Sequence, residues 1–162
     1  MEDEVGDVLF DTCLQCSDPG LITLDRGGLY TVTVFSQYSH GTGTYAFKIW
    51  SVAPPDEFSI NVGDTISQDR PGPGAGYIET PGALDIYTFT GKAGQTITIT
   101  LADMDLPELY WRLEDEAENE LFNNCIQCGN PEPITLDHDG EYTIIVGNEN
   151  NSGTGVYEFK IE

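Results

Sequence analysis

The sequence predicts an all-β protein, an antiparallel β-sandwich of jelly-roll type, and three observations support that prediction. Short runs rich in Val, Ile, Thr, Tyr and Phe alternate between apolar and polar residues. Segments rich in Gly, Pro, Asn and Asp separate these runs at intervals of roughly ten residues. No stretch has the apolar period of an amphipathic helix. Two packed sheets would bury the apolar faces of such strands.

The expected strands follow one another along residues 51–162, each ending at a turn segment. Their ranges are 76–80, 84–90, 95–102, 109–115, 141–147 and 156–162. Large aromatic residues within these runs are expected in the core rather than on a ligand-binding surface. They are Tyr87, Phe89, Tyr110, Trp111, Tyr142, Tyr157 and Phe159.

An internal repeat organises the chain. Residues 2–50 align without a gap on residues 114–162 (114 − 2 = 112), and 24 of the 49 aligned pairs are identical. The chain therefore holds about one and a half tandem repeats: a complete sandwich repeat, 51–162, preceded by the C-terminal half of another, 1–50. Met1 aligns with Leu113, so we expect Met1 to be an interior position of a longer polypeptide. A half-sandwich would expose an apolar face, to be covered by a preceding segment, by another copy or by exchange with the complete domain.

Composition excludes several classes of partner. The chain has 28 acidic and 6 basic residues, a formal net charge of −22, and 39% hydrophobic residues. The apolar content suffices for a core, so this is not a disordered acidic tail. So negative a surface repels nucleic acid and anionic lipid, and no apolar run is long enough for direct membrane insertion. Cations, Ca²⁺ above all, and basic protein surfaces remain as attractive partners.

Four cysteines form two Cys-x-x-Cys pairs, Cys13 with Cys16 and Cys125 with Cys128, at matching positions of the repeat. A redox dithiol would need a helix N-terminus to lower the thiol pKa, and a proline-containing turn follows each pair instead. A four-cysteine zinc site would require the two repeats to fold onto each other. The expected alternative is a local disulfide in an oxidising compartment, and a cross-link between molecules is a variant of it.

Acidic residues near the expected strand ends could supply the oxygen ligands that Ca²⁺ prefers. The candidates are Asp85, Asp103, Asp105 and Asp115. No EF-hand or nonapeptide calcium motif is present, and a solvated acidic face is the equally weighted alternative. We expect at least one weak calcium site per repeat, near Asp85, Asp103 or Asp105.

The run from 79 to 101, ETPGALDIYTFTGKAGQTITITL, resembles the bacterial pre-peptidase C-terminal domain family. Its most specific positions are Asp85, Tyr87, Phe89, Ala93, Gly94 and Gln95, together with the later Gly-x-Tyr strand that begins at Gly155. The resemblance spans 56–162 and, through the repeat, 2–50. It implies a secreted, non-catalytic β-sandwich module that in some relatives binds calcium. Collagen binding is not carried over, because only Asp56 and Glu57 stand before the first strand.

Catalysis is not expected. His40 and His138 occupy non-equivalent places in the two repeats, and no nucleophile elbow, metalloprotease motif or phosphate loop occurs. The leading hypothesis is a structural repeat of a bacterial or archaeal surface protein, adhesin or filament. It would be extracellular or at the cell surface, with copies of itself or neighbouring repeats as partners, assembling head to tail by completing the half-domain.

The alternative hypothesis is an accessory module of a secreted enzyme that binds carbohydrate or protein. It would need outward-facing aromatic side chains on one sheet, and the candidates are Tyr38, Trp50 and Tyr77. The second copy has Asn150 and Glu162 in place of Tyr38 and Trp50. This loss between copies disfavours a ligand site shared by the repeats.

Overall fold

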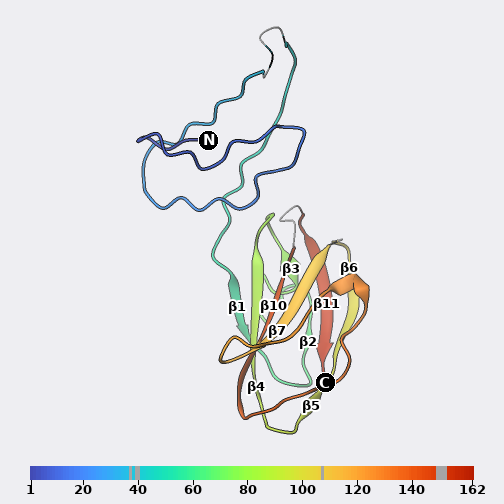
Figure 1. Cartoon of the computed structure of the whole chain (residues 1–162). Helices are drawn as coiled ribbons and strands as arrows, with labels where there is room; N and C mark the ends of the chain where they lie inside the picture. The colour runs from blue at the N-terminus through green and yellow to red at the C-terminus, as the bar shows by residue number, and fades with distance from the viewer. Residues whose placement is uncertain (37, 39–40, 107, 149–152) are drawn as a thin grey trace. The chain divides into compact units, whose positions relative to one another are not determined.

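A computed structural model describes residues 1–36, 38, 41–106, 108–148 and 153–162. The chain divides into two compact units, Met1–Ile49 and Trp50–Glu162 (Figure 1). The second unit contains all the named strands and has the predicted all-β sandwich architecture. No helix within the described ranges is long and apolar enough to cross a membrane.

One layer of the second unit is a five-stranded sheet. Its strands, in spatial order, are β1 (Asp56–Ser59), β4 (Leu84–Gly91), β10 (Gly140–Asn148), β7 (Leu109–Asp115) and β8 (Glu120–Cys125). Neighbouring strands are antiparallel except β1 and β4, which run parallel. The predicted antiparallel sandwich is confirmed, and the parallel pair β1–β4 is an exception at this edge. Strand pairing cannot be read from alternation, because both orientations give the same period of two.

The other layer is built around β11 (Gly155–Ile161). Along one side β11 pairs with β6 (Ile99–Met104), and along the other with the short strands β2 (Thr65–Ile66) and β3 (Tyr77–Ile78). All of these pairings are antiparallel. The C-terminal strand of the chain thus lies in the middle of its sheet and depends on strands that precede it by many residues.

The predicted strand 95–102 is interrupted at Thr98. Its first part, β5 (Thr96–Ile97), pairs with β9 (Ile134–Thr135) in a two-stranded ribbon, and its second part is β6. Thr98 exchanges two backbone hydrogen bonds with Glu162, with N···O distances of 2.8 and 2.9 Å. Ile97 and Ile99 are both buried, so the alternation of apolar and polar residues runs through Thr98 without a break. For this reason the sequence pattern does not reveal that the strand changes partner there.

Side chains from both sheets interdigitate in one hydrophobic core. The largest fully buried side chains are Trp111, Tyr87, Tyr142, Tyr157 and Phe159. Their rings pack edge-to-face in the pairs Tyr87–Phe159 and Trp111–Phe159, with centroids 5.4 and 6.1 Å apart. Of the predicted core aromatics, Tyr110 alone is only half-buried. It neighbours Trp111 on β7, so its side chain points to the opposite face of the sheet.

The first unit contrasts with the second. In its described residues the backbone forms no extended strand, only isolated bridges from Glu2 to Val8 and to Thr31. The same sequence pattern forms β8 to β11 in the second unit. In that unit the partners β4, β6 and β7 come from residues 51–115, and the first unit has no counterpart of most of that segment. A sheet strand needs cross-strand partners for its backbone groups and its apolar face.

Candidate functional site

Asp85 is the buried charge of the second unit. Its side chain is fully buried, although an aspartate is rarely found so unless it is paired. Its Oδ2 accepts hydrogen bonds from the hydroxyl of Tyr87, at 3.2 Å, and from that of Tyr157. The two hydroxyls are also 2.8 Å from each other. Asp85 Oδ1 has no hydrogen-bond partner among the described residues.

The strands place these groups. Asp85 and Tyr87 are two residues apart on β4, so both point to the inner face, and Tyr157 comes from β11 in the facing sheet. Gly76 completes the network because its backbone N–H donates to the Tyr87 hydroxyl at 2.9 Å. Gly76 has φ 69°, and a Cβ there would collide with the backbone of Ser67. Glycine is therefore required for this approach.

Two more carboxylates lie beside this cluster. Asp56 stands opposite Asp85 in the parallel register of β1 and β4. Glu79 follows β3, and a Cβ on Gly74 would collide with Asp56 Oδ2 and lie 3.2 Å from Glu79 Oε1. Asp56, Glu79 and Asp85 are the acidic cluster of the second unit. Sequence reasoning missed Asp56 and Glu79 as members, because their proximity depends on the parallel pairing of β1.

The electrostatics of the cluster favour protonation. Burial raises the pKa of Asp85 from 3.8 to about 7, against the hydrogen bonds from Tyr157 and Tyr87, and the charges of Glu79 and Asp56 raise it further. Burial also raises the pKa of Glu79, which a backbone hydrogen bond lowers and Asp56 raises. The pKa values of both tyrosines are raised, first by burial and then by their charged or phenolic neighbours. Both tyrosines therefore act as neutral hydrogen-bond donors.

The structure does not bring the four predicted calcium ligands together. Asp103 Oδ1 accepts the backbone N–H of Met104 at 2.9 Å, and Asp105 Oδ1 accepts that of Val156 at 2.7 Å. Their carboxylates thus hold turns and strand ends. Among the described residues, no three His, Cys, Asp or Glu side chains form a group that could hold a metal ion.

Asp115 has a separate structural role. It accepts hydrogen bonds from the backbone N–H groups of Ala117 and Asn119 at 2.9 and 2.8 Å in the turn between β7 and β8. Hydrogen bonds from the side chain and backbone of Asn119 lower its pKa. In the register of the sheet Asp115 lies opposite Tyr142, whereas Asp85 lies opposite Val146. The two acids are therefore at different levels of the sandwich.

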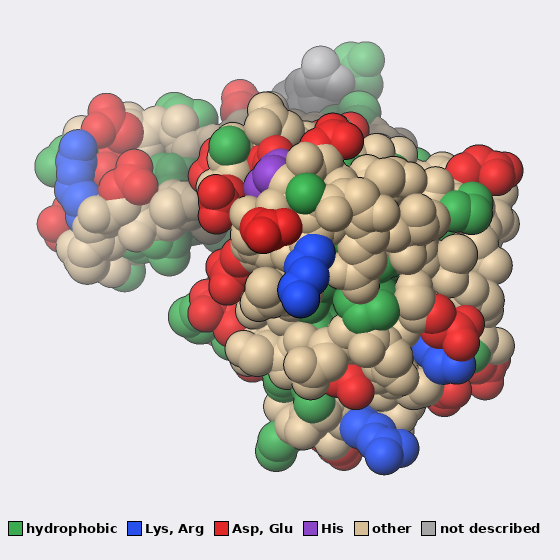
Figure 2. Space-filling view, turned by 90° about the horizontal axis from the view of Figure 1, so that it is seen from below, with side chains coloured by type: hydrophobic (Ala, Val, Ile, Leu, Met, Phe, Trp, Pro, Cys, Tyr) green, Lys and Arg blue, Asp and Glu red, His purple; other side chains and the backbone are tan. Residues whose placement is uncertain are grey.

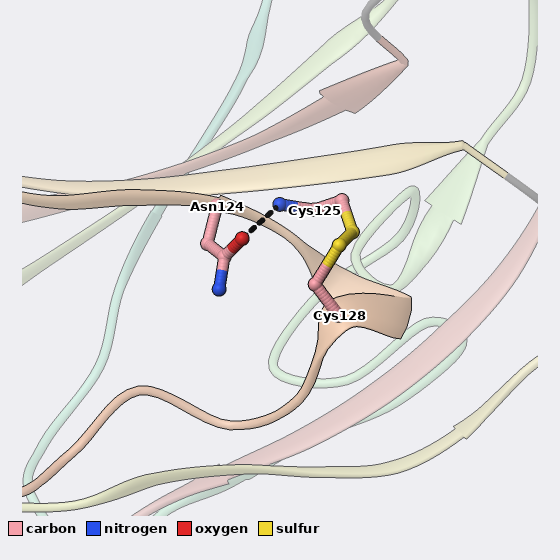
Figure 3. The surroundings of a disulfide bond; sticks show 3 residues. All are labelled: Asn124, Cys125 and Cys128. Atoms are coloured by element: carbon pink, nitrogen blue, oxygen red, sulfur yellow. Dashed lines mark hydrogen bonds between the residues drawn. A yellow bond between two sulfur atoms is a disulfide. The ribbon is translucent and has the colours of Figure 1, made fainter.

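Both cysteine pairs are joined as local disulfides, Cys13–Cys16 and Cys125–Cys128. The second closes the turn η1 (Ile126–Cys128) directly after β8 (Figure 3). Asn124 Oδ1 accepts the backbone N–H of Cys125 at 2.9 Å beside it. Ile126, between the two sulfurs, is buried in the core, so the disulfide fixes the turn that inserts this side chain.

The remaining candidates do not form a shared site. Tyr38 is exposed and belongs to the first unit, while Trp50 is exposed and Tyr77 half-buried in the second. His138 stacks on Tyr142 with ring centroids 5.2 Å apart, and His40 lies outside the described residues. Figure 2 shows one face of the molecule, where acidic side chains are spread widely and the basic ones stand isolated among them.

Comparisons with known proteins agree with this architecture. No protein-family model matches the sequence, and no curated protein matches it. A solved structure with the same fold is the pre-peptidase C-terminal domain of collagenase from Bacillus anthracis. It has a TM-score of 0.54 and 20% identity and covers 68% of this chain and 98% of that one. At this identity the likeness shows the fold.

Two further structures are periplasmic inhibitors of g-type lysozyme. The protein from Aeromonas hydrophila has a TM-score of 0.46 and 16% identity, covering 67% of this chain and 100% of that one. The protein from Salmonella Typhimurium has a TM-score of 0.45 and 13% identity, covering 66% and 99%.

Proposed function

We propose that this protein is a non-catalytic structural repeat module of an extracellular or cell-surface protein of a bacterium or archaeon. The observation that carries the proposal is the first unit. It has the sequence of a C-terminal half-repeat, and its apolar side chains are exposed. A half-repeat with an exposed apolar face is suited to joining other modules in series, as in an adhesin or filament.

Two features of the chain support this role. The second unit has the fold of a collagenase's pre-peptidase C-terminal domain, and each unit has one local disulfide, which suits an oxidising, extracellular compartment.

Calcium is the second part of the proposal. Its support is the buried, unpartnered Asp85 Oδ1 with Asp56 and Glu79 beside it. A cation bound there would satisfy Oδ1 and relieve the repulsion among three carboxylates. As they stand, the three carboxylates do not form a group that could hold a metal ion, so Asp56 and Glu79 would have to move towards Asp85 on binding to supply the outer ligands.

The test of the proposal is the solution mass, measured by size-exclusion chromatography with light scattering at several concentrations, in Ca²⁺ and in EDTA. We expect species heavier than the 17.7 kDa chain, formed through the apolar face of residues 2–50. The double variant Phe47→Asp, Ile49→Asp should be monomeric, because it places charges on that face, where the counterparts Phe159 and Ile161 are buried. A wild-type chain that stays monomeric in both buffers would overturn association through the first unit.

A ligand-binding accessory module is the second candidate function. Exposed Trp50 and Tyr38 favour it, because aromatic rings in water are common in carbohydrate and protein recognition. A glycan array with the wild-type chain and the Trp50→Ala variant separates this function from the first. Binding that depends on Trp50 would favour the accessory role.

A further inference from the structure

The side chains exposed in the first unit are those buried in the second, 112 positions later. Tyr157 is 1% exposed and Tyr45 is 61% exposed. Phe159 is 0% exposed and its counterpart Phe47 is 54%. The same reversal holds for Ile161 and Ile49, Ile126 and Leu14, and Leu136 and Leu24. The first unit thus carries most of a sandwich core without the half that covers it.

In the second unit, the strands that cover these side chains come from residues 51–113. β10 lies between β4 and β7, and β11 lies between β6 and the pair β2 and β3. The counterpart of β10 in the first unit is 28–36, and the counterpart of β11 is 43–49. Among the described residues, 43–49 has neither neighbour, and 28–36 keeps only the bridge between Thr31 and Glu2, which corresponds to the pair Thr143–Glu114 of β10 and β7.

We propose that residues 28–36 and 43–49 form a docking surface for an N-terminal half-repeat with the strand pattern of residues 51–113. The segment 28–36 would enter a sheet between a β4-like and a β7-like strand, and 43–49 would pair with a β6-like strand. This inference rests on the proposed function as a module in series and names the partner that completes the first unit.

A second copy of this chain does not fully satisfy the surface. Each copy holds two C-terminal halves, 2–50 and 114–162, and one N-terminal half, 51–113. If one copy donates its 51–113 segment to a neighbour, its own 114–162 loses its cover. Self-association therefore leaves one half uncovered per copy, and the occupant that completes every half is an additional N-terminal half-repeat.

One position sets the specificity of this partner. Gly147 lies opposite Leu84 on β4 and Tyr110 on β7, and a Cβ on it would collide with Leu84 Cδ2. In the first unit the aligned residue is Phe35. A half-repeat that docks there must leave room for the phenyl ring. We therefore expect a partner with a residue smaller than leucine at the position of Leu84 to dock better than one in which a leucine must shift its side chain.

The test joins a second copy of residues 51–112 directly ahead of Met1, so that Met1 takes the place of Leu113 and the chain holds two full repeats. Two versions are compared by hydrogen exchange, one with native Leu84 in the added segment and one with Leu84→Ala there. In the Leu84→Ala version, amides of 28–36 should gain protection by at least about a hundredfold over the parent chain. The gain should be smaller with leucine.

The amides of 140–148 are the internal reference, and they should exchange at the same rate in all versions. A fusion with Trp111→Asp in the added segment should lose the gain at 28–36, because it cannot form the covering core. The inference would be overturned if 28–36 in the Leu84→Ala fusion exchanged as in the parent while 140–148 stayed protected. In the fused chain the docking is intramolecular. A monomeric parent chain would therefore overturn only the self-association proposed above and not this inference.

Discussion

Tyr157 donates its phenolic hydrogen to the buried carboxylate of Asp85, joining β11 in one sheet to β4 in the other. Tyr87 donates to the same oxygen at 3.2 Å. The two donors only partly replace the water that Asp85 loses on folding, because Oδ1 stays without a partner. The charge state of Asp85 is therefore coupled to the stability of the sandwich.

Stability should fall as pH rises from about 4 to about 7. The pKa of Asp85 is raised from 3.8 to about 7 in the folded state, so the native protein binds more protons than the unfolded chain within that window. The free energy of unfolding then decreases with pH and becomes level above it. At about 1.4 kcal/mol per unit, the loss is at most about 4 kcal/mol.

Urea unfolding in EDTA at a series of pH values measures this slope. The Asp85→Asn variant cannot ionise and should flatten the curve between pH 4 and 7. A wild-type stability that rises across this window in step with the variant would contradict the assignment.

Removing the Tyr157 hydroxyl should destabilise the second unit. At pH 8, where Asp85 is mostly charged, Tyr157→Phe deletes a charge-assisted hydrogen bond and should cost about 2–3 kcal/mol in urea unfolding. Tyr45→Phe is the matched control, since Tyr45 is the aligned residue and is exposed. It should change stability by less than about 0.5 kcal/mol. Equal effects of the two substitutions would refute the role of the Asp85 contact.

Calcium should bind weakly near Asp85. Calorimetric titration with millimolar Ca²⁺ at pH 8 should give heat that Asp85→Asn abolishes, because its unpartnered oxygen is the buried ligand. Asp115→Asn is the control, since that carboxylate is already engaged by the turn after β7, and it should bind as the wild type does. If the wild type gave no heat of binding at millimolar Ca²⁺, the calcium proposal would be wrong.

The Cys125–Cys128 disulfide should stabilise the second unit only modestly. A ring of this size restricts the unfolded chain by roughly 2 kcal/mol. Reduction should therefore lower the midpoint of thermal unfolding without loss of the native near-ultraviolet circular dichroism. The double variant Cys125→Ser, Cys128→Ser should behave like the reduced wild type, and Cys13→Ser, Cys16→Ser should leave the midpoint unchanged. Complete unfolding on reduction would show that the bond holds the fold.

The amino-acid sequence by itself determined the all-β class, the places of β4, β7, β10 and β11 and most of the core, whereas β8 was not among the predicted strands. Alternation in β4, β7, β10 and β11 is a local property, so it can be read residue by residue. Nearly all the predicted aromatic core residues are buried, and Tyr110 departs because it lies on the outer face of β7. The cysteine spacing likewise predicted the local disulfides that the structure contains.

Tertiary structure alone decided which acidic side chains lie close together and which of the two aligned segments forms strands. Asp85 was a candidate from the sequence, but Asp56 reaches it only through the parallel pairing of β1, and Glu79 through the turn that follows β3. Aligned segments that are identical at 24 of 49 positions form strands in 114–162, and no named strand lies among the described residues of 2–50. A β-strand is stabilised by partners distant in sequence, so local pattern specifies which face could be buried but not whether anything is there to bury it.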